Sequence, residues 1–100
     1  MASPLPITPK RIEAAKRALV RAYAEGCHGR FVDVWEQAGV AYGQYVSPTG
    51  ETYHVCDGGC TCKAGARGLL CKHRVALADL VGTLDRYIPG VYNSDNPLAA

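Results

Sequence analysis

Three cysteines and one histidine fall within fourteen positions of this chain, in the pattern C-x-C, eight residues, C-x-H. Thiolate sulfur and imidazole nitrogen are donors that Zn²⁺ prefers, and a tetrahedral structural site takes four of them. Because the protein supplies all four donors, no position is left open for water or a substrate. The pattern therefore predicts one structural zinc ion, with ligands Cys60, Cys62, Cys71 and His73.

The spacing also restricts the local structure around these donors. Side chains two residues apart point the same way in an extended segment, so Cys60 and Cys62 can reach one ion from a strand or a tight turn. Residues two apart in a helix lie about 200° apart, so Cys71 must precede or cap a helix whose first turn holds His73. The positive end of that helix then favours charged thiolates.

Four other cysteine and histidine residues are possible donors. His54 and Cys56 are interpreted as strand residues facing solvent, since four better-placed ligands already complete a tetrahedral site. The dipeptide Cys27-His28 is interpreted as part of a turn. A disulfide between Cys60 and Cys62 is disfavoured, because a single intervening residue strains the ring.

Length and composition indicate one small globular domain. The chain has 100 residues, 48% of them hydrophobic and 20% charged. A domain of this size buries a modest share of its surface, so a bound metal adds needed stability. The N-terminus lacks the apolar core of a signal peptide, and no apolar run is long enough to cross a membrane. Five cysteines, an odd number, then indicate a reducing compartment, and we expect a cytoplasmic protein, or a nuclear one in a eukaryote.

A helix is predicted over residues 9–25, after an extended arm over residues 1–8. Thr8 and Pro9 suit the N-cap and first helical positions, and Gly26 ends the helix. An apolar stripe recurs at spacings of three and four residues. Its members are Ile12, Ala15, Leu19 and Tyr23.

Residues 40–46 and 51–56 are predicted to form a β-hairpin around the turn Ser47–Gly50. Residues 31–35 favour a short strand, although a helical turn through Gln37 is also possible, and Trp35 is expected in the core.

Apolar residues from Val75 to Ile88 repeat at helical spacing, which predicts a helix from about Cys71 to just before Pro89. Residues 90–100 are expected to be a loose tail. The predicted fold is α+β: a zinc-stapled β-hairpin and C-terminal helix over about 40–88, with an added N-terminal helix, in one domain spanning 9–89.

The hairpin followed by C-x-C, a variable loop and C-x-H resembles the SWIM zinc finger over about residues 40–82. The matching parts are Tyr53–Val55, Cys60–Cys62, Cys71–His73 and a following helix that bears Ala76. The resemblance implies a ββα fold with zinc held by the same four ligands. SWIM domains occur in bacterial proteins, chromatin-remodelling ATPases, plant transposases and recombination factors, and are thought to bind DNA or proteins. Family membership does not choose between these two classes of partner.

The distribution of charge favours DNA as the partner. Residues 58–78 contain four basic residues and no acidic one. Three thiolates on Zn²⁺ contribute 2 − 3 = −1, so this segment carries about +3. The expected nucleic-acid-binding residues are Lys63, Arg67, Lys72 and Arg74, with Arg17 and Arg21 from the N-terminal helix. Arg67 and Arg74 are the strongest candidates, while a solvated face that only aids solubility is the competing interpretation.

A protein partner is the alternative. Four aromatic residues can form an exposed patch, or can instead pack between the hairpin and the N-terminal helix. They are Trp35, Tyr42, Tyr45 and Tyr92. The sequence shows no nucleophile–base pair and no phosphate-binding glycine loop, so we expect neither an enzyme nor a small-molecule substrate.

Overall fold

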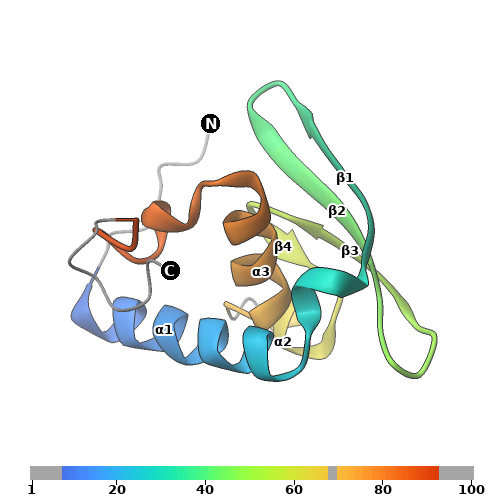
Figure 1. The fold of residues 1–100 in the computed structure, drawn as a ribbon, viewed down its shortest axis with the longest axis horizontal. Helices are drawn as coiled ribbons and strands as arrows, with labels where there is room; N and C mark the ends of the chain where they lie inside the picture. Colours follow the sequence, from blue (N-terminus) through green and yellow to red (C-terminus); the bar gives the residue numbers. More distant parts are fainter. Residues whose placement is uncertain (1–7, 68–69, 93–100) are drawn as a thin grey trace.

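The computed structural model describes residues 8–67 and 70–92. The predicted arm up to residue 7, the predicted tail from residue 93, and residues 68 and 69 of the loop between Cys62 and Cys71 lie outside these ranges. The elements are α1 (Pro9–Ala24), η1 (Cys27–Arg30), β1 (Phe31–Gln37), β2 (Val40–Val46), β3 (Thr52–Cys56), β4 (Gly59–Cys60), α2 (Lys63–Ala66), α3 (Lys72–Val81) and η2 (Leu84–Arg86). The predicted α+β fold is confirmed (Figure 1).

Helix α1 begins as its sequence predicts. The side chain of Thr8 accepts a hydrogen bond from the backbone N–H of Arg11, and Pro9 occupies the first helical turn. The helix ends before Gly26, whose left-handed φ of 67° suits glycine. Small residues dominate the buried face, which lets α1 lie close to its neighbours; this face comprises Ala15, Ala18, Leu19 and Ala22. Tyr23, predicted on the apolar stripe, is 58% exposed instead.

The sheet is antiparallel, in the order β1-β2-β3-β4. The predicted hairpin is confirmed as β2 and β3, and β1 joins β2 through the two-residue turn Ala38–Gly39. Both turn residues have positive φ, 54° and 79°, as the tight hairpin turn that matches the twist of the strands requires.

Trp35 does not lie in the core, so that prediction is wrong. Phe31 packs edge-on against the buried Tyr45, on the inner face of the sheet. A bulge between Phe31 and Asp33 then reverses the alternation of side chains along β1. Trp35 consequently lies on the outer face, opposite Tyr42, and is 41% exposed.

Helix α3 lies between α1 and the sheet (Figure 1) and contacts both. It therefore buries side chains on two sides rather than along one stripe. Leu77 faces the sheet, whereas Val75 and Ala78 face α1. None of the helices in the described ranges combines the length and apolar character needed to cross a membrane.

Helix α3 is shorter than predicted, because it ends at Val81 with Gly82 as a left-handed C-cap, φ 79°. The apolar residues beyond it are nonetheless buried. Leu84, Ile88 and Val91 join the cluster between α1 and α3 from η2 and the turns that follow. The periodicity thus identified core residues correctly but assigned them to the wrong backbone structure.

Candidate metal centre

The four predicted donors come together at the start of α3. Cys60 lies in β4, Cys62 is the N-cap of α2, Cys71 is the N-cap of α3, and His73 lies in the first turn of α3. Their donor atoms all lie within 4.8 Å of one another, and all four residues are buried. The expectation that Cys71 caps the helix while His73 enters its first turn is confirmed.

Gly65 sets the path of the chain between the two pairs of donors. Its backbone N–H donates to Cys62 Sγ at 3.4 Å, which supplies a partner for a thiolate. A Cβ at this position would overlap the carbonyl oxygen of Cys60 and lie 2.7 Å from its carbonyl carbon. Only glycine lets α2 pack this closely against β4, so Gly65 is a positioning residue for Cys60 and Cys62.

One separation between donor atoms matches the edge of a tetrahedral site. In a tetrahedron with metal–sulfur distances of about 2.3 Å and metal–nitrogen distances of about 2.0–2.1 Å, the sulfur–nitrogen edge is about 3.6 Å. The separation between Cys60 Sγ and His73 Nδ1 is 3.6 Å. Three sulfurs and an imidazole nitrogen within one small buried volume are donors typical of zinc.

A hydrogen bond between Cys60 and Cys71 shifts the pKa values of the two thiols in opposite directions. The pKa of Cys71 lies well below its usual range, because Cys60 donates a hydrogen bond to it and His73 and the backbone N–H of Arg74 add to the effect against the cost of burial. The same hydrogen bond, together with burial, raises the pKa of Cys60. A lowered thiol pKa, as at Cys71, favours the thiolate form that binds a metal.

Aromatic rings on the inner face of the sheet hold the histidine ligand in place. The rings of Tyr45 and Tyr53 have centroids 4.3 and 5.3 Å from that of His73. The hydroxyl of Tyr45 donates to Cys27 Sγ at 3.4 Å, so Cys27 is a buried acceptor outside the metal cluster. The sheet therefore positions a ligand that α3 supplies.

The remaining possible donors lie elsewhere. His54 and Cys56 belong to β3 and point to its outer face, exposed and half-buried respectively, and neither joins the metal cluster. His28 Nε2 lies 2.8 Å from Asp79 Oδ2, and Tyr23 stacks on the His28 ring at 4.6 Å. The Tyr23 hydroxyl donates to the same Asp79 oxygen, which raises the pKa of Tyr23 to about 12. This contact ties the end of α1 to α3.

A groove with a volume of about 450 Å³ lies between α1 and the metal centre, bordered by Cys62, Cys71 and His73. Four of the six predicted nucleic-acid-binding residues line it: Arg17, Arg21, Lys63 and Lys72. We call this feature the basic groove. Glu25 pairs with two of these cations, because its carboxylate lies 2.5 Å from Lys72 Nζ and 3.9 Å from Arg21 Nε.

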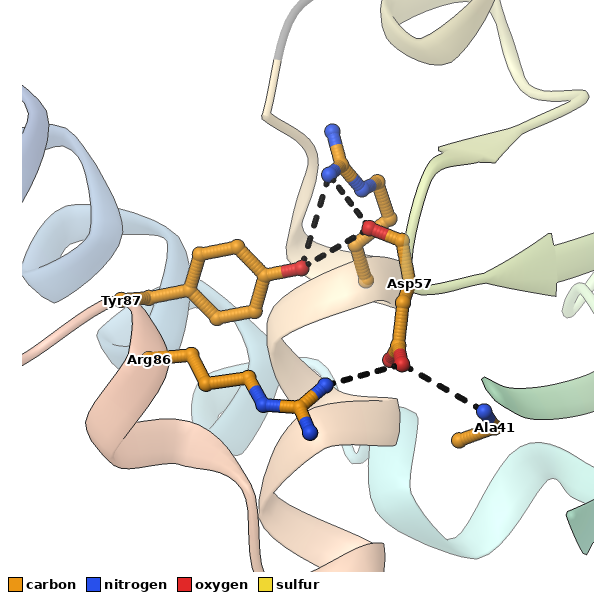
Figure 2. Close-up of polar contacts among 5 residues, drawn as sticks. Ala41, Asp57, Arg86 and Tyr87 are labelled. Carbon is orange, nitrogen blue, oxygen red and sulfur yellow. Dashed lines mark hydrogen bonds and ion pairs between the residues drawn. The ribbon is translucent and has the colours of Figure 1, made fainter. Parts of the chain in front are cut away.

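Arg74, one of the two strongest candidates for contact with nucleic acid, does not extend from an exposed helix start as we expected. Its guanidinium is part-buried and donates to the carbonyl oxygen of Asp57 at 2.7 Å and to the Tyr87 hydroxyl at 3.4 Å. Asp57 also bonds the backbone N–H of Ala41 and the guanidinium of Arg86 (Figure 2). Arg74 thus helps to fasten the β3–β4 turn to the helices. Arg67, the other strong candidate, is exposed but does not line the groove.

The four aromatic residues do not form a single patch. Tyr45 is 3% exposed and belongs to the inner face of the sheet. Trp35 and Tyr42 stack on the outer face with centroids 5.7 Å apart. Tyr92 is exposed beyond η2, where its hydroxyl accepts a hydrogen bond from the Leu84 N–H.

Sequence reasoning missed two residues of this site. Gly65 follows Cys62 by three positions, the spacing at which a capping side chain meets a backbone N–H, and this signal was available. Glu25 is the C-cap of α1, and no motif in the sequence singles it out. Its contact with Lys72 joins residues 47 positions apart and depends on how α1 packs against α3, which the sequence pattern does not reveal.

The family model described as SWIM zinc finger matches residues 31–82. No curated protein and no solved structure is significantly similar to the chain. The match begins at the first residue of β1, so the family unit includes a strand that lies before the 40–82 segment singled out from the sequence. It covers more than half of the chain and all four clustered donors, and the chain belongs to the SWIM zinc finger family.

Proposed function

We propose that this chain is a zinc-binding module in which one Zn²⁺ ion has a structural role and the basic groove binds DNA. The basic groove carries this proposal, because two segments far apart in sequence contribute cations to one concave surface. Arg17 and Arg21 come from α1, whereas Lys63 and Lys72 flank the metal ligands.

A structural role for the ion follows from the donors. Cys60, Cys62, Cys71 and His73 are all buried and complete a four-coordinate set without water. Zinc would supply the charge and the geometry that join β4, α2 and the start of α3. The residues around it would exclude water and fix the ligand side chains, with His73 packed against Tyr45.

The charge of the groove suits a phosphate backbone. Four basic side chains contribute +4, Glu25 contributes −1, and a zinc ion with three thiolates contributes −1, which leaves about +2. Arginine guanidinium groups bind phosphate oxygens in a bidentate manner, and Arg17 and Arg21 lie one helical turn apart. Contacts of this kind are independent of base sequence. They weaken as the salt concentration rises, because the release of counterions from DNA then gains less free energy.

The test is a salt titration of labelled duplex and single-stranded DNA with the zinc-loaded chain. The logarithm of the binding constant should fall linearly with the logarithm of salt concentration, by about 0.9 per duplex phosphate contacted. Changing Arg17→Gln and Lys63→Gln together should reduce this slope by about 2. The matched control is Arg11→Gln, an exposed cation on the same helix that does not line the groove.

Two results would contradict the proposal. One is the absence of DNA binding, or binding that salt does not weaken. The other is an equal loss of affinity in Arg11→Gln and in the groove variant, because this would indicate a general charge effect rather than a defined surface.

A protein partner is a second candidate, and a specific observation favours it. Trp35 and Tyr42 are stacked on a sheet face that carries no lysine or arginine, and stacked aromatic residues of this kind are enriched in protein interfaces. This surface is separate from the basic groove.

A further inference from the structure

The charges of the chain are divided between two parts of the molecule. Residues 31–57, which form β1 to β3 and their turns, contain no lysine or arginine and four acidic residues. Residues 8–30, which include α1, contain six basic and two acidic residues. Asp57 is paired with Arg86, so the acidic surface of the sheet comes from Asp33, Glu36 and Glu51, and the basic groove lies outside it.

Strand β1 is a free edge of this sheet, since β2 is its one strand partner in the described ranges. The turn Ala38–Gly39 determines which of its backbone groups are unpaired. Pairs alternate between hydrogen-bonded and non-hydrogen-bonded from the turn outward, so Val34 and Glu36 direct their N–H and C=O groups away from β2. Edge strands are commonly protected by lysine or proline, and β1 contains neither.

The side chains around this edge are apolar and exposed. Val32 is 64% exposed, Val34 36% and Trp35 41%. Stacking on Tyr42 already fixes the Trp35 ring. A partner that contacts the ring would therefore lose little side-chain entropy on binding. Asp33 lies between the two valines and Glu36 follows Trp35, and their carboxylates lie on opposite faces of the strand.

We infer that the free edge of β1 binds an extended, lysine- or arginine-bearing segment of a partner protein, which adds to the sheet as a fifth strand. Backbone bonds to Val34 and Glu36 would supply register, and Asp33 and Glu36 would select a basic sequence. A second copy of this chain is a poorer occupant, because each β1 would bring two carboxylates and no cation. The inference uses no residue of the basic groove.

The probe is a pair of synthetic peptides of about eight residues, in which valine and threonine alternate with lysine in one and with glutamate in the other. Trp35 is the only tryptophan in the chain, so its fluorescence reports on this edge directly. The lysine peptide should bind the zinc-loaded chain at least about tenfold more tightly than the glutamate peptide, and less tightly as salt is raised. Hydrogen exchange should slow at Val34 and Glu36 when it binds.

Two variants separate strand addition from simple charge attraction. Val34→Pro removes an N–H that points away from β2, and an edge strand tolerates proline at such a position. The variant should bind the lysine peptide about tenfold or more weakly. The double variant Asp33→Asn and Glu36→Gln should weaken it and flatten its salt dependence. Unchanged zinc content in each variant shows that the fold is kept, and Val20→Ala, an exposed valine on α1, is the matched control.

Several outcomes would overturn the inference. These are no binding of the lysine peptide, equal binding of both peptides, or binding that Val34→Pro leaves unchanged. A dimer of the free chain in sedimentation that Val34→Pro dissociates would assign the edge to a second copy instead. DNA binding by the basic groove is measured separately, so failure here does not affect that proposal.

Discussion

Two regions of the molecule are held in place by different interactions. One is the metal-bearing part, which comprises β4, α2 and the start of α3, and the other is the β1–β2 hairpin. Cys60, Cys71 and His73 are buried among side chains from the sheet and α3, and Gly65 packs directly against the backbone of β4. The far end of the hairpin has exposed side chains along β1 and is held by its backbone ladder and the Trp35–Tyr42 pair. Because of this close packing, substitutions in the metal-bearing part should be poorly tolerated. The hairpin, in contrast, has exposed surface available for a partner.

The two parts also differ in charge, because the metal centre is negatively charged and the hairpin lies away from it. The basic groove lies beside a centre that would carry about −1 with zinc bound, so nearby cations are stabilised there. The hairpin has no such centre and carries acidic residues on exposed strand positions. The difference predicts that variants in the two parts will change separate properties.

A large effect is expected from Gly65→Ala in the metal-bearing part. Alanine favours a helix over glycine by about 1 kcal/mol, but the added Cβ would collide with the backbone of Cys60. We expect a net loss of about 3 kcal/mol in the free energy of unfolding, measured by denaturant titration, and a weaker affinity for zinc.

Gly58→Ala is the control for this variant, since a Cβ there meets no atom within 4 Å. Its stability should stay within about 0.5 kcal/mol of the original chain. If both variants were equally stable, the tight fit of α2 against β4 would not be what holds Cys60 and Cys62 together.

A smaller effect is expected from Trp35→Ala in the hairpin. The ring is 41% exposed and contacts Tyr42, so its removal should cost about 1 kcal/mol in unfolding free energy. Tyr45→Ala on the opposite face should cost about 3–5 kcal/mol, because that ring is buried against Phe31 and His73. Equal losses would show that the outer face of the hairpin is packed as tightly as the inner one.

The smallest change in stability is expected from Glu25→Gln, which removes the acidic partner of Lys72 and Arg21. A surface pair of this kind contributes less than about 1 kcal/mol, yet its loss frees two cations of the basic groove. DNA affinity at low salt should therefore rise by about threefold or more. Glu13→Gln, which removes the partner of Lys16 outside the groove, should not raise it.

The ion pair between Glu25 and Lys72 also makes its own contribution to stability depend on pH, and the direction of that dependence follows from the pKa of Glu25. The hydrogen bond from Lys72 lowers the pKa of Glu25, so the ion pair is complete above the ordinary pKa of a glutamate and is lost as the pH falls through the lowered value. At neutral pH the carboxylate is charged and competes with phosphate. A DNA affinity that falls in Glu25→Gln would contradict this role.

Much of the fold follows from local signals in the sequence. Thr8 and Pro9 fix the start of α1 through capping and a preset φ, and the turn Ser47–Gly50 fixes the β2–β3 hairpin. The two-residue spacing of Cys71 and His73 is incompatible with a regular helix unless Cys71 is its cap, and the structure has it so. Such features depend on a few neighbouring residues, which is why they were predictable.

The predictions from sequence were wrong where packing between residues far apart in the chain determines the position of a side chain. Trp35 is exposed because a bulge reverses the faces of β1, and no residue type marks that bulge. Arg74 turns inward because Asp57 and Tyr87 offer acceptors that only the folded chain brings near. The basic groove, likewise, needs the packing of α1 beside the metal centre.

The most direct test of the central claim is the zinc content and melting temperature of three proteins: the original chain, Cys62→Ala and Cys56→Ala. Cys56 is the matched control, a half-buried cysteine outside the metal cluster. We predict one zinc ion per chain in the original and in Cys56→Ala, with loss of folded structure when a chelator removes it. Cys62→Ala should lose the ion and melt at a much lower temperature. A Cys62→Ala chain that keeps both its zinc and its melting temperature would contradict the account.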